Sequence, residues 1–127
     1  MKIERSIDVE EEIRENLTTY IQTYVKPLPK NFTVPSILVT AVGGTEQNKI
    51  DTFEVTLDSR AETEEEALTN LRNAVGILKK IANSQTTDLR YVTVNTLGSW
   101  GRDPVRPELA MCTSRLRVIA HLENVEV

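Results

Sequence analysis

The chain has 127 residues and a mass of 14.3 kDa, which is enough for one domain with a single hydrophobic core. Hydrophobic residues make up 39% and charged residues 27%, as in folded soluble proteins, and no apolar run approaches the roughly 20 residues that cross a membrane. The net charge of −4, with basic residues scattered along the chain, argues against tight duplex binding, because such binding depends on clustered cations.

An amphipathic helix is predicted over residues 8–24. Its apolar residues recur at steps of three and four, which place them on one helix face: Val9, Ile13, Leu17, Tyr20, Ile21 and Tyr24. Asp8 is placed to cap the first turn, and three glutamates follow it, where the helix dipole favours negative charge. Three prolines then keep residues 26–35 extended.

Two strands are predicted after the prolines. Residues 37–42 are β-branched and almost all apolar, which indicates a strand buried on both faces or nearly so. Gly43 and Gly44 are predicted to form the turn that ends it. Residues 52–59 alternate between apolar and polar side chains, which is typical of a half-exposed strand, and we expect it to run antiparallel to the first.

A long helix is predicted next, with Thr63 as its cap and Glu64, Glu65 and Glu66 in its first turn. We expect its apolar face to be formed by Leu68, Leu71, Val75, Leu78 and Ala82, with Ala67, Ala74 and Ile81 beside them. This face is predicted to pack on sheet residues of both neighbouring strands, namely Phe53, Val55, Leu57, Val92 and Val94.

Two more strands, over residues 91–97 and 111–122, are predicted on either side of a long loop at 98–107. The order of elements is helix, strand, strand, long helix, strand, loop, strand. It predicts a single α+β domain over residues 1–127, with a four-stranded, mainly antiparallel sheet packed by two helices.

The sequence contains no arrangement of residues that is typical of an active site. Cys112 is the only cysteine, which excludes an internal disulfide and a cysteine zinc cluster. His121 is the only histidine and lies nine positions further on, so the two side chains point to opposite faces of an unbroken strand. No nucleophile elbow, zinc-protease, phosphate-loop or paired-cysteine spacing occurs. We therefore expect no catalytic residues, no metal and no cofactor, and a protein that is not an enzyme.

The loop at 98–107 has the composition of a binding segment. It carries Trp100, Arg102 and Arg106, and tryptophan and arginine are enriched at the energetic centres of protein interfaces. The alternative is that Trp100 folds back over the core while the arginines are solvated. We predict that these three residues contact another subunit or a partner protein.

From residue 8 to residue 125 the chain resembles the tail terminator proteins of long-tailed bacteriophages. The resemblance rests on the amphipathic first helix, the proline-containing stretch, and the strand sequence SILVTAV over residues 36–42. It continues with residues 52–67, where a strand runs straight into a glutamate-rich helix, and with the strands at 89–97 and 111–122 around a polar loop.

The resemblance implies a homohexameric ring that caps the tail tube and stops its polymerisation. The ring would bind the tail tube protein on one face and a head completion or stopper protein on the other, while DNA passes through its lumen without being read. Its location would be the virion neck, and the host cytoplasm during assembly, with no membrane contact. The alternatives are a ferredoxin-like domain that binds a small regulatory ligand, and a head completion or stopper protein of the same neck.

Overall fold

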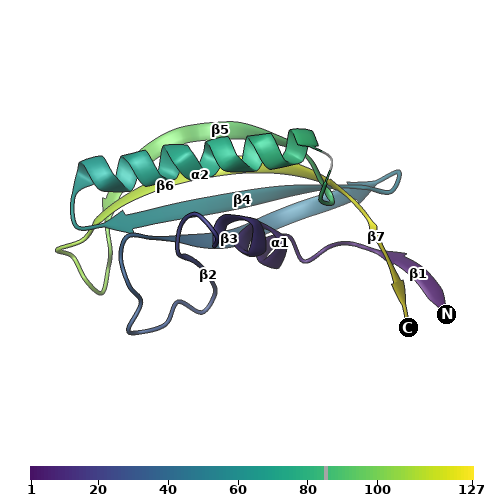
Figure 1. Cartoon of the computed structure of the whole chain (residues 1–127), viewed down its shortest axis with the longest axis horizontal. Helices are drawn as coiled ribbons and strands as arrows, with labels where there is room; N and C mark the ends of the chain where they lie inside the picture. Colours follow the sequence, from purple (N-terminus) through teal and green to yellow (C-terminus); the bar gives the residue numbers. More distant parts are fainter. Residues whose placement is uncertain (85) are drawn as a thin grey trace.

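The computed structural model describes residues 1–84 and 86–127, with all their side chains except that of Leu97. It contains two helices and seven strands in this part of the chain (Figure 1). Their bounds are β1 (Lys2–Arg5), α1 (Val9–Leu17), β2 (Thr23–Val25), β3 (Ser36–Gln47), β4 (Ile50–Ala61), α2 (Glu64–Ser84), β5 (Leu89–Arg102), β6 (Ala110–His121) and β7 (Glu123–Glu126).

The main sheet has five strands in the order β2-β3-β4-β6-β5, and a separate two-stranded sheet pairs β1 with β7. The prediction of a four-stranded sheet is therefore wrong. The additional strands are only three or four residues long, so alternation cannot reveal them. β2 runs parallel to β3. β1 meets β7 across almost the whole chain length, with Lys2 opposite Glu126, and the two termini lie together in Figure 1.

Connectivity around α2 distinguishes this sheet from a ferredoxin-like one. β4 and β5 are both antiparallel to β6, which lies between them, so α2 joins two parallel strands of a split βαβ unit. A ferredoxin-like sheet needs a second such unit. Here β1 lies in the other sheet, and the arrangement therefore differs from that alternative.

Helix α1 is shorter than predicted. Asp8 caps it, since a carboxylate oxygen accepts a hydrogen bond from the Glu11 amide at 3.2 Å. Its buried residues are Val9, Ile13 and Leu17, and the helix ends there. Two threonines follow, a residue type of low helix propensity. Tyr20 is consequently 68% exposed, and Tyr24 lies in β2 instead of on the helix.

The turn between β3 and β4 is also displaced from its predicted place. β3 continues to Gln47, and the two-residue turn is Asn48-Lys49, with φ of 55° and 64°. Two left-handed residues are typical of the turn that matches strand twist in a hairpin. Gly43, at φ 152°, lies at a register shift within β3, which is the site of a bulge. Only one face of β3 is fully buried, through Ile37 and Val39.

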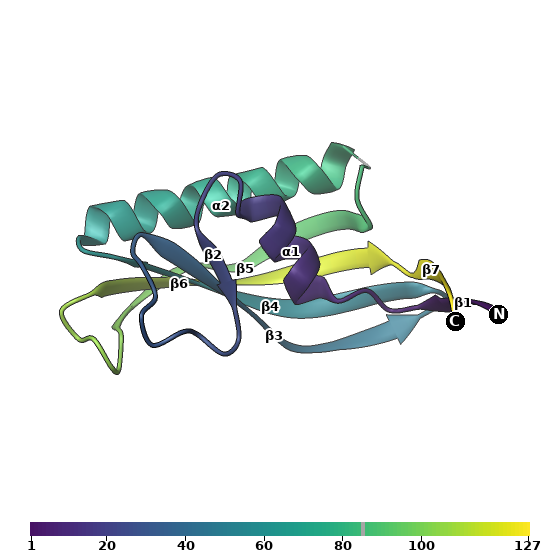
Figure 2. The same ribbon diagram turned by 60° about the horizontal axis from the view of Figure 1, so that its bottom comes forward.

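Both helices pack on one face of the main sheet (Figure 2). α2 lies along β4, β5 and β6, whereas α1 lies beside α2 and over β3. The buried side chains of α2 are Ala67, Leu71, Ala74, Leu78 and Ala82. The predicted burial of Leu71 and Leu78 is confirmed, while Leu68 and Val75 are only partly buried at the margins. Three alanines on the buried face let the helix approach the sheet closely.

The opposite face of the main sheet carries polar and charged side chains and has no helix over it in the part of the chain that the structure describes. Cross-strand rows on this face include Thr40, Thr56 and Arg115, and also Glu54, Arg117 and Thr93. Arg117 pairs with Glu54 at 3.1 Å between Nε and Oε1. This face is therefore available to solvent or to a polar partner.

Candidate assembly interface

The first half of the predicted loop at 98–107 belongs to a strand. β5 continues through Arg102, and only residues 103–109 connect it to β6. Trp100 lies opposite Cys112 and Arg102 opposite Ala110 in the pairing of β5 with β6. Trp100 is 50% exposed and Arg102 is exposed, so both are accessible at the end of an outer strand. The sequence predicted a loop here because Gly98 and Gly101, which are typical of turns, occur within this part of the strand.

Arg106 lies apart from the other two predicted contact residues because it binds within the chain. Its guanidinium donates to the Phe32 carbonyl at 3.3 Å and lies 5.0 Å from the centre of the Phe32 ring. Its Nε also pairs with Glu108 at 3.3 Å. Arg106 thus connects the β5–β6 loop to the proline-containing stretch, whereas Trp100 and Arg102 face outward.

A buried ion pair supports the same loop. Nε of Arg60 lies 2.6 Å from Oδ2 of Asp103, and both side chains are almost fully buried. Burial alone would raise the pKa of Asp103, but hydrogen bonds from the Arg106 amide, the Arg60 guanidinium and the Val105 amide together hold the pKa of this carboxyl below its ordinary value. Arg60 also lies 5.8 Å from the centre of the Phe32 ring.

Sequence reasoning missed this cluster of Phe32, Arg60, Asp103 and Arg106. Its members are contributed by three separated segments, so no local pattern joins them. One signal was present, because Phe32 is the only aromatic residue between positions 26 and 35. A buried aromatic ring in an extended, proline-containing stretch is what holds that stretch against the sheet.

The main sheet has two outer edges with unpaired backbone. On one side is β5, whose only strand partner among the described residues is β6. On the other side β2 covers only Ile37, Leu38 and Val39, which leaves the second half of β3 without a strand partner among the described residues. The Ala41 amide on this edge instead donates to Oε2 of Glu10 at 2.7 Å. Such edges are templates for pairing with another chain.

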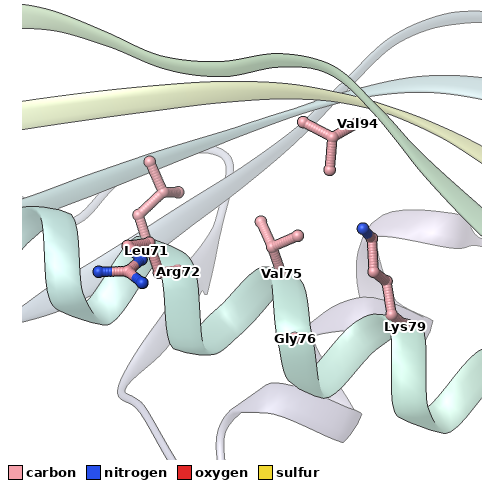
Figure 3. A pocket seen from close by; sticks show the side chains of 6 residues that line it. All are labelled: Leu71, Arg72, Val75, Gly76, Lys79 and Val94. Atoms are coloured by element: carbon pink, nitrogen blue, oxygen red, sulfur yellow. The ribbon is translucent and has the colours of Figure 1, made fainter.

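A groove of about 250 Å³ runs beside the β5 edge, between β5 and α2 (Figure 3). Val75 and Val94 point toward each other across it, and Arg72 and Lys79 lie to either side of Val75 along the helix. A second hollow continues past Lys79 to Tyr91 and Val92. The β5 edge therefore combines an apolar floor with positive charges.

A cavity of about 420 Å³ lies beside the β3 edge and is acidic. Residues 43–46 of β3 line it together with Ser6, Asp51 and Phe53. Asp51 is only 2% exposed, and its Oδ2 atom is buried without a hydrogen-bond partner in the described part of the chain. Glu46 lies directly opposite Asp51 in the β3–β4 ladder and is exposed.

Cys112 and His121 do not meet. Cys112 is fully buried in the core, whereas His121 is exposed, as their odd spacing predicts. Burial raises the pKa of the Cys112 thiol, which disfavours the thiolate needed of a nucleophile. Among residues 1–84 and 86–127, no three histidine, cysteine or acidic side chains lie where they could share a metal ion. Neither helix of this part has the length and apolar character needed to span a membrane.

No family model and no curated protein sequence matches this chain. The function is therefore inferred from the structure itself, which has two free sheet edges, a cationic groove beside one of them and an acidic cavity beside the other.

Proposed function

We propose that this chain is a structural protein of phage morphogenesis, whose copies form a ring that caps the tail tube, stops tube polymerisation and provides the surface for head–tail joining. The observation that carries this proposal is the pair of free edges on the main sheet: the part of β3 that β2 does not cover on one side, and β5 on the other. The number of subunits, six, and the location on the phage tail are taken from the resemblance of the sequence to tail terminator proteins.

The directions of the two edge strands suit head-to-tail association. β3 is antiparallel to β4, β4 to β6, and β6 to β5, so β3 and β5 run in opposite directions. A second copy set beside the first in the same orientation would therefore pair its β5 antiparallel to the first copy's β3. Main-chain hydrogen bonds would supply affinity, as in other cases of strand addition.

Such an interface joins two different surfaces and repeats around an axis, which is how a heterologous contact closes into a ring. Termination then requires only that one face of the ring copy the contacts of a tube subunit while the other does not. In this proposal the first face binds the tail tube protein and the second a head completion or stopper protein. The net charge of −4 is consistent with passage of DNA through the lumen without specific binding.

The proposal is tested by measuring the mass and shape of the assembled protein. Light scattering after size-exclusion chromatography, over a range of concentrations and with tail tube protein added, should give a species of about six subunits, in keeping with closed cyclic symmetry. Negative-stain images of that species should show rings. A protein that remains monomeric with the tube protein present, or that forms only a two-fold dimer, would contradict the proposal.

A further inference from the structure

Two buried side-chain polar atoms lack a hydrogen-bond partner in the described part of the chain, Nη1 of Arg60 and Oδ2 of Asp51, and only Asp51 lies beside a cavity at a free sheet edge. Asp51 lines a cavity but is only 2% exposed, and its buried Oδ2 atom has no hydrogen-bond partner among the described residues. Buried carboxylates are normally paired with a cation or fully hydrogen-bonded, because burial without a partner is costly. An unsatisfied carboxylate at a cavity therefore indicates that a donor is supplied from outside the chain.

Two further carboxylates make this edge of the sheet negative. Glu46 is the ladder partner of Asp51 and shares its cavity. Glu10 reaches the same edge from α1, where Oε2 accepts the Ala41 amide at 2.7 Å. The missing donor is thus expected to be a cation.

The opposite edge offers such a cation. Lys79 borders both the groove and the hollow beside β5, is exposed, and forms no ion pair with another described residue. Its long methylene stem lets the ammonium group reach across apolar surface. Figure 3 shows Lys79 on α2 beside the groove, and the same side chain also lines the second hollow.

The cavity and Lys79 lie at the same height along the strands, at opposite ends of one row of paired residues. One row crosses the sheet through Gly44, Phe53, Val118 and Val92. Gly44 and Phe53 line the acidic cavity at one end of this row, and Val92 lines the hollow of Lys79 at the other. The buried residues of the row also show that both features lie on the helix-covered face of the sheet.

We propose that the cavity at Asp51 and Glu46 receives the Lys79 ammonium group of a second copy of this chain, when β3 of one copy pairs with β5 of the next. This inference rests on the proposed ring and names the contact that locks neighbouring subunits together. It gives each subunit an acidic edge at β3 and a basic edge at β5, so a two-fold pairing of like edges is disfavoured by charge.

A disulfide experiment tests the contact directly. In a Cys112→Ala background, Glu46→Cys combined with Lys79→Cys should give, on oxidation of the assembled protein, a ladder of linked species up to the full ring. Neither single cysteine should form a ladder. The matched control combines Lys79→Cys with Glu64→Cys, since Glu64 lies in the first turn of α2, and it should not crosslink beyond traces.

Charge reversal gives an independent measurement. Lys79→Glu should weaken assembly by about tenfold or more, because it sets a third carboxylate against Asp51 and Glu46. Glu46→Lys in the same chain should restore assembly. Lys80→Glu is the matched control: Lys80 is also exposed but borders the hollow near Tyr20 on the other side of α2. It should change assembly less than about threefold, as expected of an exposed charge.

The outcomes separate this inference from the proposed function. Rings that form without crosslinks, and that respond equally to Lys79→Glu and Lys80→Glu, would overturn the contact and leave the ring standing. A chain that stays monomeric and uncrosslinked with tube protein present would overturn both. A third arm adds calcium to the isolated chain. A rise in melting temperature that Asp51→Asn abolishes would identify the cavity as a cation site and also overturn the inference.

Discussion

At the scale of single residues, the contrast between Arg106 and its neighbours shows what composition can indicate. Tryptophan and arginine between positions 98 and 107 predicted a contact surface, and the structure leaves Trp100 and Arg102 accessible for one. Arg106 instead binds Phe32, which lies 74 positions earlier in the chain. Whether an arginine serves the fold or a partner depends on such distant contacts.

The ion pair between Arg60 and Asp103 is expected to be the most sensitive polar contact in the domain. Asp103→Asn should lower the free energy of unfolding at neutral pH by about 3–5 kcal/mol, because it leaves the buried Arg60 charge uncompensated. Urea denaturation followed by circular dichroism measures this loss. Glu108→Gln is the control, because its pair with Arg106 is exposed, and it should cost about 1 kcal/mol or less. A loss below 1 kcal/mol for Asp103→Asn would contradict the assignment.

The loss of unfolding free energy caused by Asp103→Asn is expected to depend on pH in one direction. The pKa of Asp103 is lowered in the folded protein, so its contribution is fully present above the ordinary pKa of 3.8 and is lost as the pH falls through the lower folded value. The stability difference between Asp103→Asn and the parent chain should therefore shrink on acidification into this range. A difference that grows as the pH falls would contradict the assigned shift.

Cys112 is expected to be chemically inert in the folded protein and dispensable for assembly. Because burial raises the pKa of its thiol, the thiolate population is small at pH 8, and a thiol reagent should react at the rate at which the chain opens. Labelling in denaturant should be fast. Cys112→Ala should retain both fold and ring formation, and a folded variant that fails to assemble would contradict this prediction.

At the scale of elements, periodicity predicted the long elements well and the short ones poorly. The burial of Leu71 and Leu78 was predicted because α2 has 21 residues, long enough for its apolar period to stand out. β1, β2 and β7 have three or four residues each, and their partners are selected by tertiary contacts. The turn was predicted at Gly43-Gly44 and not at Asn48-Lys49, where the structure has it, because glycine is a stronger indicator of a turn than an asparagine-lysine pair.

The exact face that α2 turns to the sheet can be tested by a pair of substitutions. Leu71→Ala should cost about 2–5 kcal/mol of unfolding free energy, since the side chain is 1% exposed and its removal leaves a cavity. Leu68→Ala, at the margin of the same helix, should cost clearly less because it is only partly buried. Chemical denaturation of both variants measures this. A larger loss at Leu68 than at Leu71 would show that the helix is rotated from the described position.

At the scale of the whole molecule, the two sheet edges are different in kind. The β3 edge is partly covered by β2 and is acidic, whereas the β5 edge is longer and has Arg72 and Lys79 beside it. Register shifts interrupt the pairing of both strands. Edges that remain exposed are normally blunted, because they invite uncontrolled pairing. Retaining two complementary edges makes physical sense when a closed ring satisfies both, since closure removes every free edge at once.

A phage deletion would test the proposed function in assembly. If the ring caps the tail tube, a phage lacking it should assemble tubes without a stop signal and should lack the surface to which heads attach. Electron microscopy of lysates should then show free heads and tails of uncontrolled length. Supplying the parent chain or Lys80→Glu should restore joined particles, whereas Lys79→Glu should restore few, because its ring is weakened at each subunit contact. Normal joined tails in the absence of this chain would contradict the proposed function.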